Sequence, residues 1–175
     1  MKYLRFFSLL AVIGLLAGLV SGCGYRFAER SESLPSWIQT VYVAPFVNKS
    51  NEFQLASWIT EDLRREFLRG GALRLAERDE ADVIIEGEVR RVDVSGLSFL
   101  AYDKAVERRI NVECAVRMKD RRTGRILWQT ANLVRDEGFL TGRDNMESDA
   151  LKADASRKIS RYLAELIYHR VTGVF

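Results

Sequence analysis

Histidine and cysteine, the side chains that most often bind metals or act as nucleophiles, are almost missing from this chain. Its 175 residues include one histidine, His169, and two cysteines, Cys23 and Cys114. A lone histidine near the end of a helical segment has no partner for a metal site, so a surface position near a helix C-terminus is expected. There is also no glycine-rich phosphate loop, and no acidic cluster outside helix surfaces and turns. We therefore predict that the protein is not an enzyme and holds no cofactor or metal.

The sequence also lacks a surplus of charge of one sign. It carries 27 basic and 24 acidic residues, and without its first 22 residues, which hold Lys2 and Arg5, the counts are 25 and 24. A nucleic-acid-binding protein would show a concentrated basic excess, so we expect no nucleic-acid partner. With 29% charged and 47% hydrophobic residues, the composition is that of a folded globular protein.

No apolar run is long enough for an ordinary membrane-spanning helix. The longest extends from Phe6 to Val20, fifteen residues of which only Ser8 is polar, whereas a spanning helix needs about 20. Lys2 and Arg5 precede this run, and small residues follow it. This is the layout of a cleaved secretory signal peptide, which we place at residues 1–22.

A cysteine directly follows the expected cleavage point. Val20-Ser21-Gly22-Cys23 resembles the lipobox of bacterial lipoproteins, in which that cysteine becomes the first residue and carries acyl chains such as palmitate. Ordinary cleavage nearby, with Cys23 as a plain thiol, is the alternative. Several acyl chains hold a protein stably in a bilayer, and Gly24 stands where an aspartate would retain it at the inner membrane, so the resemblance implies an outer-membrane lipoprotein. Cys114 would then have no disulfide partner, and its apolar neighbours favour a buried structural thiol.

The mature chain is expected to begin with a lipidated tether at residues 23–36, followed by a single domain at residues 37–175. A first strand is predicted over 37–46, where residues favourable to strands end at Pro45. Residues 52–69 are predicted to form a helix, because their apolar residues recur at helical spacing. The charged residues of this helix, Asp62 among them, are expected on its exposed side, and Gly70-Gly71 ends it.

The signal for strands is strongest in the second half of the chain. Strands are predicted over 73–76, 83–94, 109–119 and 126–135, with a hairpin turn at Thr123-Gly124 before the last one. The alternation changes parity near Arg90-Arg91, which predicts a β-bulge. Residues 96–103 are expected to form a longer connection. A final helix should begin with Asp144 or Asn145 as its cap and run to about Arg170.

These elements can cover one another's apolar surfaces. Each helix has one apolar stripe, and strand 109–119 is apolar on one face and charged on the other. We therefore predict an α+β fold, a two-layer sandwich in which an about four-stranded, mainly antiparallel or mixed sheet is covered on one face by two helices. The opposite face of the sheet should be left charged.

Three segments together resemble the LptE family of lipopolysaccharide-assembly lipoproteins. They are Cys23-Gly24-Tyr25-Arg26-Phe27, Val41-Tyr42-Val43-Ala44-Pro45-Phe46-Val47-Asn48 and Asp82-Val83-Ile84-Ile85-Glu86-Gly87-Glu88-Val89. The resemblance implies a non-enzymatic lipoprotein that sits as a plug inside an LptD-type outer-membrane β-barrel, assists its assembly and binds lipopolysaccharide on its way to the cell surface. The domain would then lie on the periplasmic side or within the barrel lumen. The second and third segments are also similar to CsgG-like and LpoB-like envelope lipoproteins, so a secretion-ring subunit or a cell-wall synthase activator is the alternative.

Binding of lipopolysaccharide phosphates would need basic side chains placed together. The sequence offers such residues at a hairpin tip and in two strands: Lys119, Arg121, Arg122, Arg125, Arg90 and Arg91. A hairpin tip with several arginines can also be a plain solvated turn, so both interpretations stay open.

Contact with the barrel is expected from two regions of the chain. The charged sheet face would suit a polar barrel lumen. The apolar residues within 96–103 can mark an interface or fold back over the sheet edge. The predicted contact residues are Phe99, Leu100, Tyr102, Arg109, Glu113 and Arg117.

Overall fold

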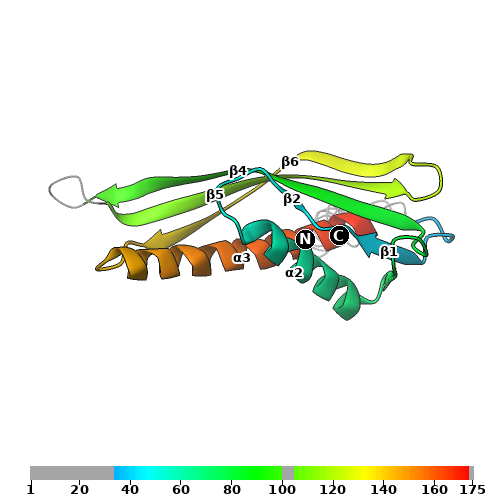
Figure 1. The fold of residues 1–175 in the computed structure, drawn as a ribbon, viewed down its shortest axis with the longest axis horizontal. Helices are drawn as coiled ribbons and strands as arrows, with labels where there is room; N and C mark the ends of the chain where they lie inside the picture. Colours follow the sequence, from blue (N-terminus) through cyan, green and yellow to red (C-terminus); the bar gives the residue numbers. More distant parts are fainter. Residues whose placement is uncertain (1–33, 100–104, 174–175) are drawn as a thin grey trace, which may run out of the picture. The chain divides into compact units, whose positions relative to one another are not determined.

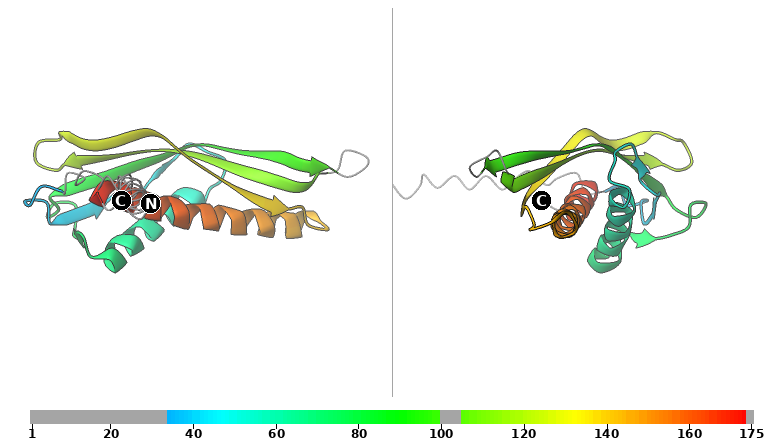
Figure 2. Two further views of the ribbon diagram at one scale, coloured as in Figure 1. Left: turned by 180° about the vertical axis from the view of Figure 1, so that it is seen from behind. Right: turned by 60° about the vertical axis from the view of Figure 1, so that its left-hand side comes forward.

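A six-stranded mixed sheet and two helices form the part of the chain that the computed structural model describes, residues 34–99 and 105–173 (Figure 1). Both helices lie on the same side of the sheet (Figure 2). The predicted α+β two-layer fold is therefore confirmed, although the sheet has more strands than the expected four or so. In chain order the elements are β1 (Thr40–Val43), β2 (Val47–Asn48), α2 (Leu55–Gly70), β3 (Arg74–Leu75), β4 (Val83–Phe99), β5 (Ala105–Asp120), β6 (Ile126–Leu140) and α3 (Asn145–Thr172).

The sheet combines a parallel half with an antiparallel half. Its strand order is β3-β1-β4-β5-β6, and β2 also pairs with β4. Strands β1, β2 and β3 run parallel to their neighbours, whereas β4, β5 and β6 form an antiparallel meander. The three long strands thus form the platform, and the short parallel strands extend one edge of it.

The extra strand, β2, arises because Pro45 interrupts the pairing of the chain with β4. Pro45 lies beyond Thr40 and Val41, the residues of β1 that pair with β3, so the chain is at the edge of the sheet there. Ala44 N–H still donates to the Ile85 carbonyl at 2.9 Å, and Lys49 N–H donates to the Val89 carbonyl at 2.9 Å. Proline has no N–H to donate and is tolerated only at a sheet edge. The predicted strand therefore stops where expected, and the chain resumes pairing with the same edge of β4 as β2.

The predicted bulge is present in β4. Its pairing with β5 shifts register between Val89 and Arg91. Before the shift, Val89 is fully buried on the helix side, and after it Val92 and Val94 pack against the core. The bulge lets one strand keep its apolar side chains on the same face along its whole length.

The core lies between the helices and the inner face of the sheet. Helix α2 contributes Ile59, Leu63 and Phe67, as predicted, and each is at most 1% exposed. Helix α3 adds Ile159, Leu163 and Ile167, and the strands add Val83, Ile85, Ile110, Val112 and Cys114. Each fully buried large aliphatic or aromatic side chain stabilises the fold by about 1.5–3 kcal/mol.

At Gly87 a side chain from the segment between β1 and β2 lies directly against the sheet. The ring of Phe46 covers this glycine so tightly that a Cβ built there would lie 2.1 Å from the Phe46 Cε1 atom. A side chain at position 87 would displace the ring, which is itself only 7% exposed. Glycine is therefore required here by packing.

Several elements extend beyond their predicted bounds, and one side chain lies on the opposite side from that expected. Strand β6 runs to Leu140 and does not end at residue 135. Residues 96–99 belong to strand β4 and do not form part of a connection, because Ser98 pairs with Glu107 and Phe99 with Ala105. Asp62 is not on the exposed side of α2: it is only 2% exposed and faces α3. Helix α3 also runs slightly beyond the expected Arg170, to Thr172.

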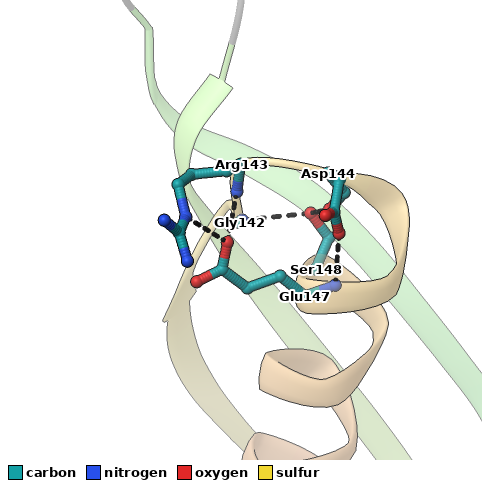
Figure 3. A network of polar contacts seen from close by, with 5 residues as sticks. All are labelled: Gly142, Arg143, Asp144, Glu147 and Ser148. Atoms are coloured by element: carbon teal, nitrogen blue, oxygen red, sulfur yellow. Dashed lines mark hydrogen bonds and ion pairs between the residues drawn. The ribbon is translucent and has the colours of Figure 1, made fainter.

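The start of α3 is fixed by reciprocal hydrogen bonds around Asp144, which is the N-cap, one of the two predicted residues (Figure 3). Asp144 Oδ1 accepts from Glu147 N–H at 2.8 Å, and Glu147 Oε2 accepts from Arg143 N–H at 2.7 Å. Ser148 Oγ completes the set, since it accepts from Gly142 N–H at 3.0 Å and donates to the Asp144 carbonyl at 2.8 Å. This arrangement satisfies N–H groups that a helix start otherwise leaves free.

Candidate functional site

The face of the sheet that the helices leave bare carries charged side chains joined across strands. Glu86 on β4 accepts from Lys119 Nζ at 2.5 Å and from Arg117 Nε at 2.8 Å, both on β5. The residues reach one another because Glu86 pairs with Arg117 and Ile84 with Lys119 in the β4–β5 register. We call this bare side the outer face.

The Glu86 carboxylate is kept ionised by these neighbours. Burial alone would raise the pKa of Glu86, but the hydrogen bonds donated by Lys119 and Arg117 outweigh it and hold the pKa below its usual value of 4.5. Glu86 therefore carries its negative charge throughout the neutral range, and it offsets the positive charges beside it.

Other charges of the outer face are paired in the same way. Glu88 lies 3.0 Å from Lys49 Nζ and 3.7 Å from Arg90 Nε. Arg91 Nε lies 2.6 Å from Asp93 Oδ2, and Arg109 Nε lies 3.4 Å from Asp136 Oδ2. The predicted charged face is present, and most of its charges are compensated within the domain.

A groove crosses the outer face between β2 and β6. Its volume is about 640 Å³, and it lies between Val47 on one side and Ala131 on the other, with the small side chain of Ala115 at its floor. Arg90 spans it by donating from Nη1 to the Ala131 carbonyl at 2.7 Å. The charged side chains that line the groove, Glu86, Glu88, Arg90 and Arg117, thus already have partners.

The hairpin between β5 and β6 forms a second polar region. Asp120 Oδ1 accepts from Thr123 N–H at 3.0 Å and from Arg122 N–H at 2.7 Å, and Gly124 adopts a φ of 70°. The bond from Thr123 N–H contributes most to keeping the pKa of Asp120 below its usual value of 3.8. The turn predicted at Thr123-Gly124 is therefore confirmed, and a charged aspartate fixes its shape.

The six basic residues predicted to bind lipopolysaccharide do not form one cluster. Lys119, Arg90 and Arg91 lie along the outer face, where each is paired with a carboxylate. Arg121, Arg122 and Arg125 lie at the hairpin tip, where Arg121 Nε donates to the Ala81 carbonyl at 2.6 Å. In the described part of the chain, Arg122 and Arg125 are the members of this set whose exposed side chains form no ion pair or hydrogen bond.

The predicted contact residues are divided in a similar way. Arg109, Glu113 and Arg117 all lie on the outer face, as the alternation of β5 indicated. Leu100 and Tyr102 lie outside the described residues, as does the side chain of Phe99.

The cysteine and the histidine within the described residues are a buried thiol and a side chain at a helix end. Cys114 is fully buried, and burial raises the pKa of its thiol to about 12, so the predicted structural thiol is found. Cys23 lies outside the described residues. His169 lies in the last turn of α3, 3.8 Å from Glu165. Within residues 34–99 and 105–173, no three His, Cys, Asp or Glu side chains are grouped as metal ligands would be.

A buried polar contact between the helices was missed by the sequence analysis. Asp62 accepts from Ser160 Oγ at 2.5 Å and from Arg65 Nη1 at 2.6 Å, and Arg157 Nη1 lies 3.4 Å away. The guanidinium of Arg157 also lies 5.3 Å from the Trp58 ring. The only signal in the sequence was that Asp62 adjoins Leu63 of the apolar stripe, which places it at the edge of the buried side.

A second aspartate, Asp82, holds β1 against β4. Its Oδ2 atom accepts from Gln39 N–H and Thr40 N–H, each at 2.9 Å, and from the Thr40 hydroxyl at 2.9 Å. The bond from Gln39 contributes most to lowering the pKa of Asp82 below its usual value of 3.8. The entry of the chain into the sheet is therefore fixed at this point.

Comparison with known proteins identifies a family whose profile matches most of the chain. The sequence profile of the LptE family, described as lipopolysaccharide-assembly, matches residues 38–171. A search of curated protein sequences returns no significant match. In the part of the chain that has been described, no helix combines the length and apolar character needed to cross a membrane.

Solved structures of bacterial lipoproteins share the fold. Rare lipoprotein B from Shewanella oneidensis is 11% identical with a TM-score of 0.53, over 75% of this chain and 94% of that chain. Lipoprotein B from Nitrosomonas europaea is 16% identical with a TM-score of 0.53, over 85% and 90%. A minor lipoprotein from Acinetobacter baumannii is 12% identical with a TM-score of 0.51, over 78% and 94%. At these identities the likeness is one of fold.

Proposed function

Because the chain belongs to the LptE family of lipopolysaccharide-assembly proteins, we propose that it is a lipid-anchored outer-membrane protein that plugs an LptD-type β-barrel. In this role it assists assembly of the barrel and the binding and insertion of lipopolysaccharide at the cell surface. It acts by occupying the lumen and by binding, and it catalyses no reaction.

The charge-compensated outer face is the observation that best supports a plug. The lumen of a large membrane barrel is polar, and placing a charged face against it removes water from the charges. Removing an unpaired charge from water costs much free energy, whereas removing an ion pair that also hydrogen-bonds costs less. On the outer face, Glu86, Glu88, Asp93 and Asp136 each have a basic partner within 4 Å.

The anchor is proposed from the sequence at the start of the chain. Acylation of Cys23 would hold the protein in the bilayer through several chains, each buried methylene contributing about 0.8 kcal/mol. Gly24, in place of an aspartate, favours the outer membrane over the inner one.

The lipopolysaccharide contact is proposed at the hairpin tip. One guanidinium group can donate to two oxygens of a phosphate at once. Arg122 and Arg125 are exposed at this tip. Replacing Arg121, Arg122 and Arg125 with glutamate should lower lipopolysaccharide binding by the purified protein. A circular dichroism spectrum like that of the wild type would show that the variant is folded, and unchanged binding by a folded variant would remove the tip as the site.

Isolation of the protein from its own membranes tests the main proposal. A plug should co-purify with one large β-barrel in equal amounts, and the free mature domain should be monomeric by mass measurement. An oligomeric ring in the absence of any barrel would contradict the proposal and favour a secretion-ring subunit. Co-purification with a cell-wall synthase would favour the activator.

A further inference from the structure

Three segments of the chain meet at the end of the sheet where the chain enters the domain. The Thr40 hydroxyl at the start of β1 donates to Asp82 at 2.9 Å, just before β4 begins. Arg121, in the β5–β6 hairpin, donates its N–H to the Asp82 carbonyl at 3.0 Å and its Nε to the Ala81 carbonyl at 2.6 Å. The hairpin tip and the first described residues are therefore held at the same end, on the right in Figure 1.

This end exposes an aromatic side chain together with unpaired cations. Trp37 is 42% exposed, two residues before Gln39 donates to Asp82. Arg122 and Arg125 are exposed at the hairpin tip and, within the described part of the chain, form no ion pair. Tryptophan is enriched at the boundary between bilayer and water, and arginine is suited to phosphate groups.

Acidic residues at the same end do not cancel these cations. Glu77, Asp79 and Glu80 follow β3, the edge strand, and two strands, β1 and β4, separate β3 from β5. Asp120, at the base of the hairpin, offsets part of the charge of Arg122, but among the described residues its carboxylate forms no ion pair with Arg122 or Arg125 and accepts the N–H groups of Arg122 and Thr123 instead. Arg74 and Arg78 lie in the same segment, so its two basic and three acidic residues leave a net charge of −1. An anionic surface would thus be attracted to the hairpin side of this end more than to the β3 side.

The length of the preceding chain sets the distance from this end to the anchor. Eleven residues lead from Cys23 to Leu34, and fully extended they span at most about 40 Å. The opposite end of the sheet lies farther away by the length of the 17-residue strand β4, about 50 Å. The hairpin end is thus the end that an acyl anchor would keep near the bilayer surface.

We infer that Trp37 and the arginines of the hairpin tip form a membrane-facing end, which binds the phosphate groups of anionic phospholipids in the leaflet that holds the acyl chains. The inference rests on the acylation of Cys23 in the proposed function. It orients the domain, with the hairpin toward the anchored leaflet and the start of α3 away from it. The same end would lie at the mouth of the barrel nearest that leaflet.

Fluorescence quenching on the acylated full-length mature protein tests this orientation. A label is attached at Thr123→Cys in the hairpin, or at Met146→Cys, which is 81% exposed at the start of α3. Cys114 is buried, and burial raises the pKa of its thiol to about 12, so it should not take the label. The protein is placed in phosphatidylcholine vesicles with or without phosphatidylglycerol, and a nitroxide on the lipid headgroup quenches the label.

With phosphatidylglycerol present, we expect the label at 123 to be quenched several-fold more than the label at 146. The difference should shrink at high salt, because the screening length falls from about 10 Å at 0.1 M to about 3 Å at 1 M. Arg122→Glu should reduce it further, since one basic side chain near an anionic surface changes binding about fivefold. The control is Arg161→Glu, at an exposed position on α3. It changes the net charge by the same amount as Arg122→Glu and should leave the difference in quenching unchanged.

Equal quenching at the two positions, or quenching at 123 that is the same without phosphatidylglycerol, would overturn the inference. So would quenching at 123 that appears only when lipopolysaccharide replaces phosphatidylglycerol, which would assign the tip to lipopolysaccharide alone. The vesicles contain no barrel, so these outcomes do not depend on the plug role. The mass of the purified protein checks acylation separately, and its absence would refute the anchor and the orientation together.

Discussion

Asp62 shows how one side chain can join two helices. Its carboxylate bonds to Ser160 on α3, which is fully buried, and to Arg65 on its own helix. We expect Asp62→Ala to lower the free energy of unfolding by about 2–3 kcal/mol, because it removes several hydrogen bonds and leaves buried polar groups without a partner. Urea denaturation of the soluble domain measures this change.

The neighbouring Glu61 provides a matched control for that measurement. It is exposed on the same helix, so Glu61→Ala should change stability by less than about 0.5 kcal/mol. Asp62→Asn can still accept from Ser160, so its loss of stability should lie between those of Asp62→Ala and Glu61→Ala. Equal stability of Asp62→Ala and Glu61→Ala would show that the contact contributes nothing.

Asp82 should make stability depend on pH in a defined direction. Hydrogen bonds, with the one from Gln39 first, lower the pKa of Asp82 in the folded protein below 3.8. A group with a lowered folded pKa stabilises the fold above its unfolded pKa, and this stabilisation is lost as the pH falls through the folded value. The wild type should therefore be more stable than Asp82→Asn at neutral pH, and the gap should close below pH 3.8. Urea midpoints across this range measure the gap, with exposed Asp79→Asn as control, and a gap that does not change with pH would contradict the assignment.

At the scale of single elements, the start of α3 depends on its N-cap. Asp144 accepts from Glu147 N–H at 2.8 Å, and an alanine there would leave that N–H without a protein partner. We expect Asp144→Ala to cost about 1 kcal/mol and to speed hydrogen exchange in the first turn. Asp149→Ala, an exposed substitution farther along the helix, should do neither. Equal exchange rates in the two variants would show that the cap does not hold the helix start.

The sequence predicted those elements whose pattern is set locally. Strand β5 alternates apolar and charged residues over its length, and its two faces are those expected. Residues 96–99 were not predicted as strand, because Gly96 is a poor strand former and pairing with residues 105–108 of the partner strand decides their conformation. The burial of Asp62 was missed for a similar reason, since its partner Ser160 lies 98 residues away in the sequence.

The sequence predicted which charged residues belong to the candidate site, but not how their side chains pair with one another. The charged outer face and the arginine-rich hairpin follow from alternation and turn residues. The pairing of Arg91 with Asp93 and of Lys119 with Glu86 depends on strand register and side-chain reach, which the bulge alters. A count of basic residues therefore does not show which of them already have a carboxylate partner.

At the scale of the whole molecule, the proposed plug depends on the balance of charge on the outer face. Glu86 sits between Arg117 and Lys119, so Glu86→Lys would place three cations together. We expect a loss of about 1 kcal/mol in stability from like-charge repulsion across the strands. We also expect weaker co-purification with the barrel, because the uncompensated charges would have to leave water.

A charge swap separates the balance of charge from the identity of the residues. The double variant Glu86→Lys/Lys119→Glu keeps one acid and one base at these positions, where the side chains are 22% and 25% exposed and 2.5 Å apart. If compensation is what allows the face to meet a polar wall, the swap should recover most of the stability and the barrel co-purification that Glu86→Lys loses. Both are measured on the same preparations, by urea midpoint and by the ratio of barrel to lipoprotein. A swapped protein that is as stable as the wild type but still fails to bring down the barrel would show that the barrel recognises Glu86 or Lys119 individually, and the compensated face would then not be the reason for docking.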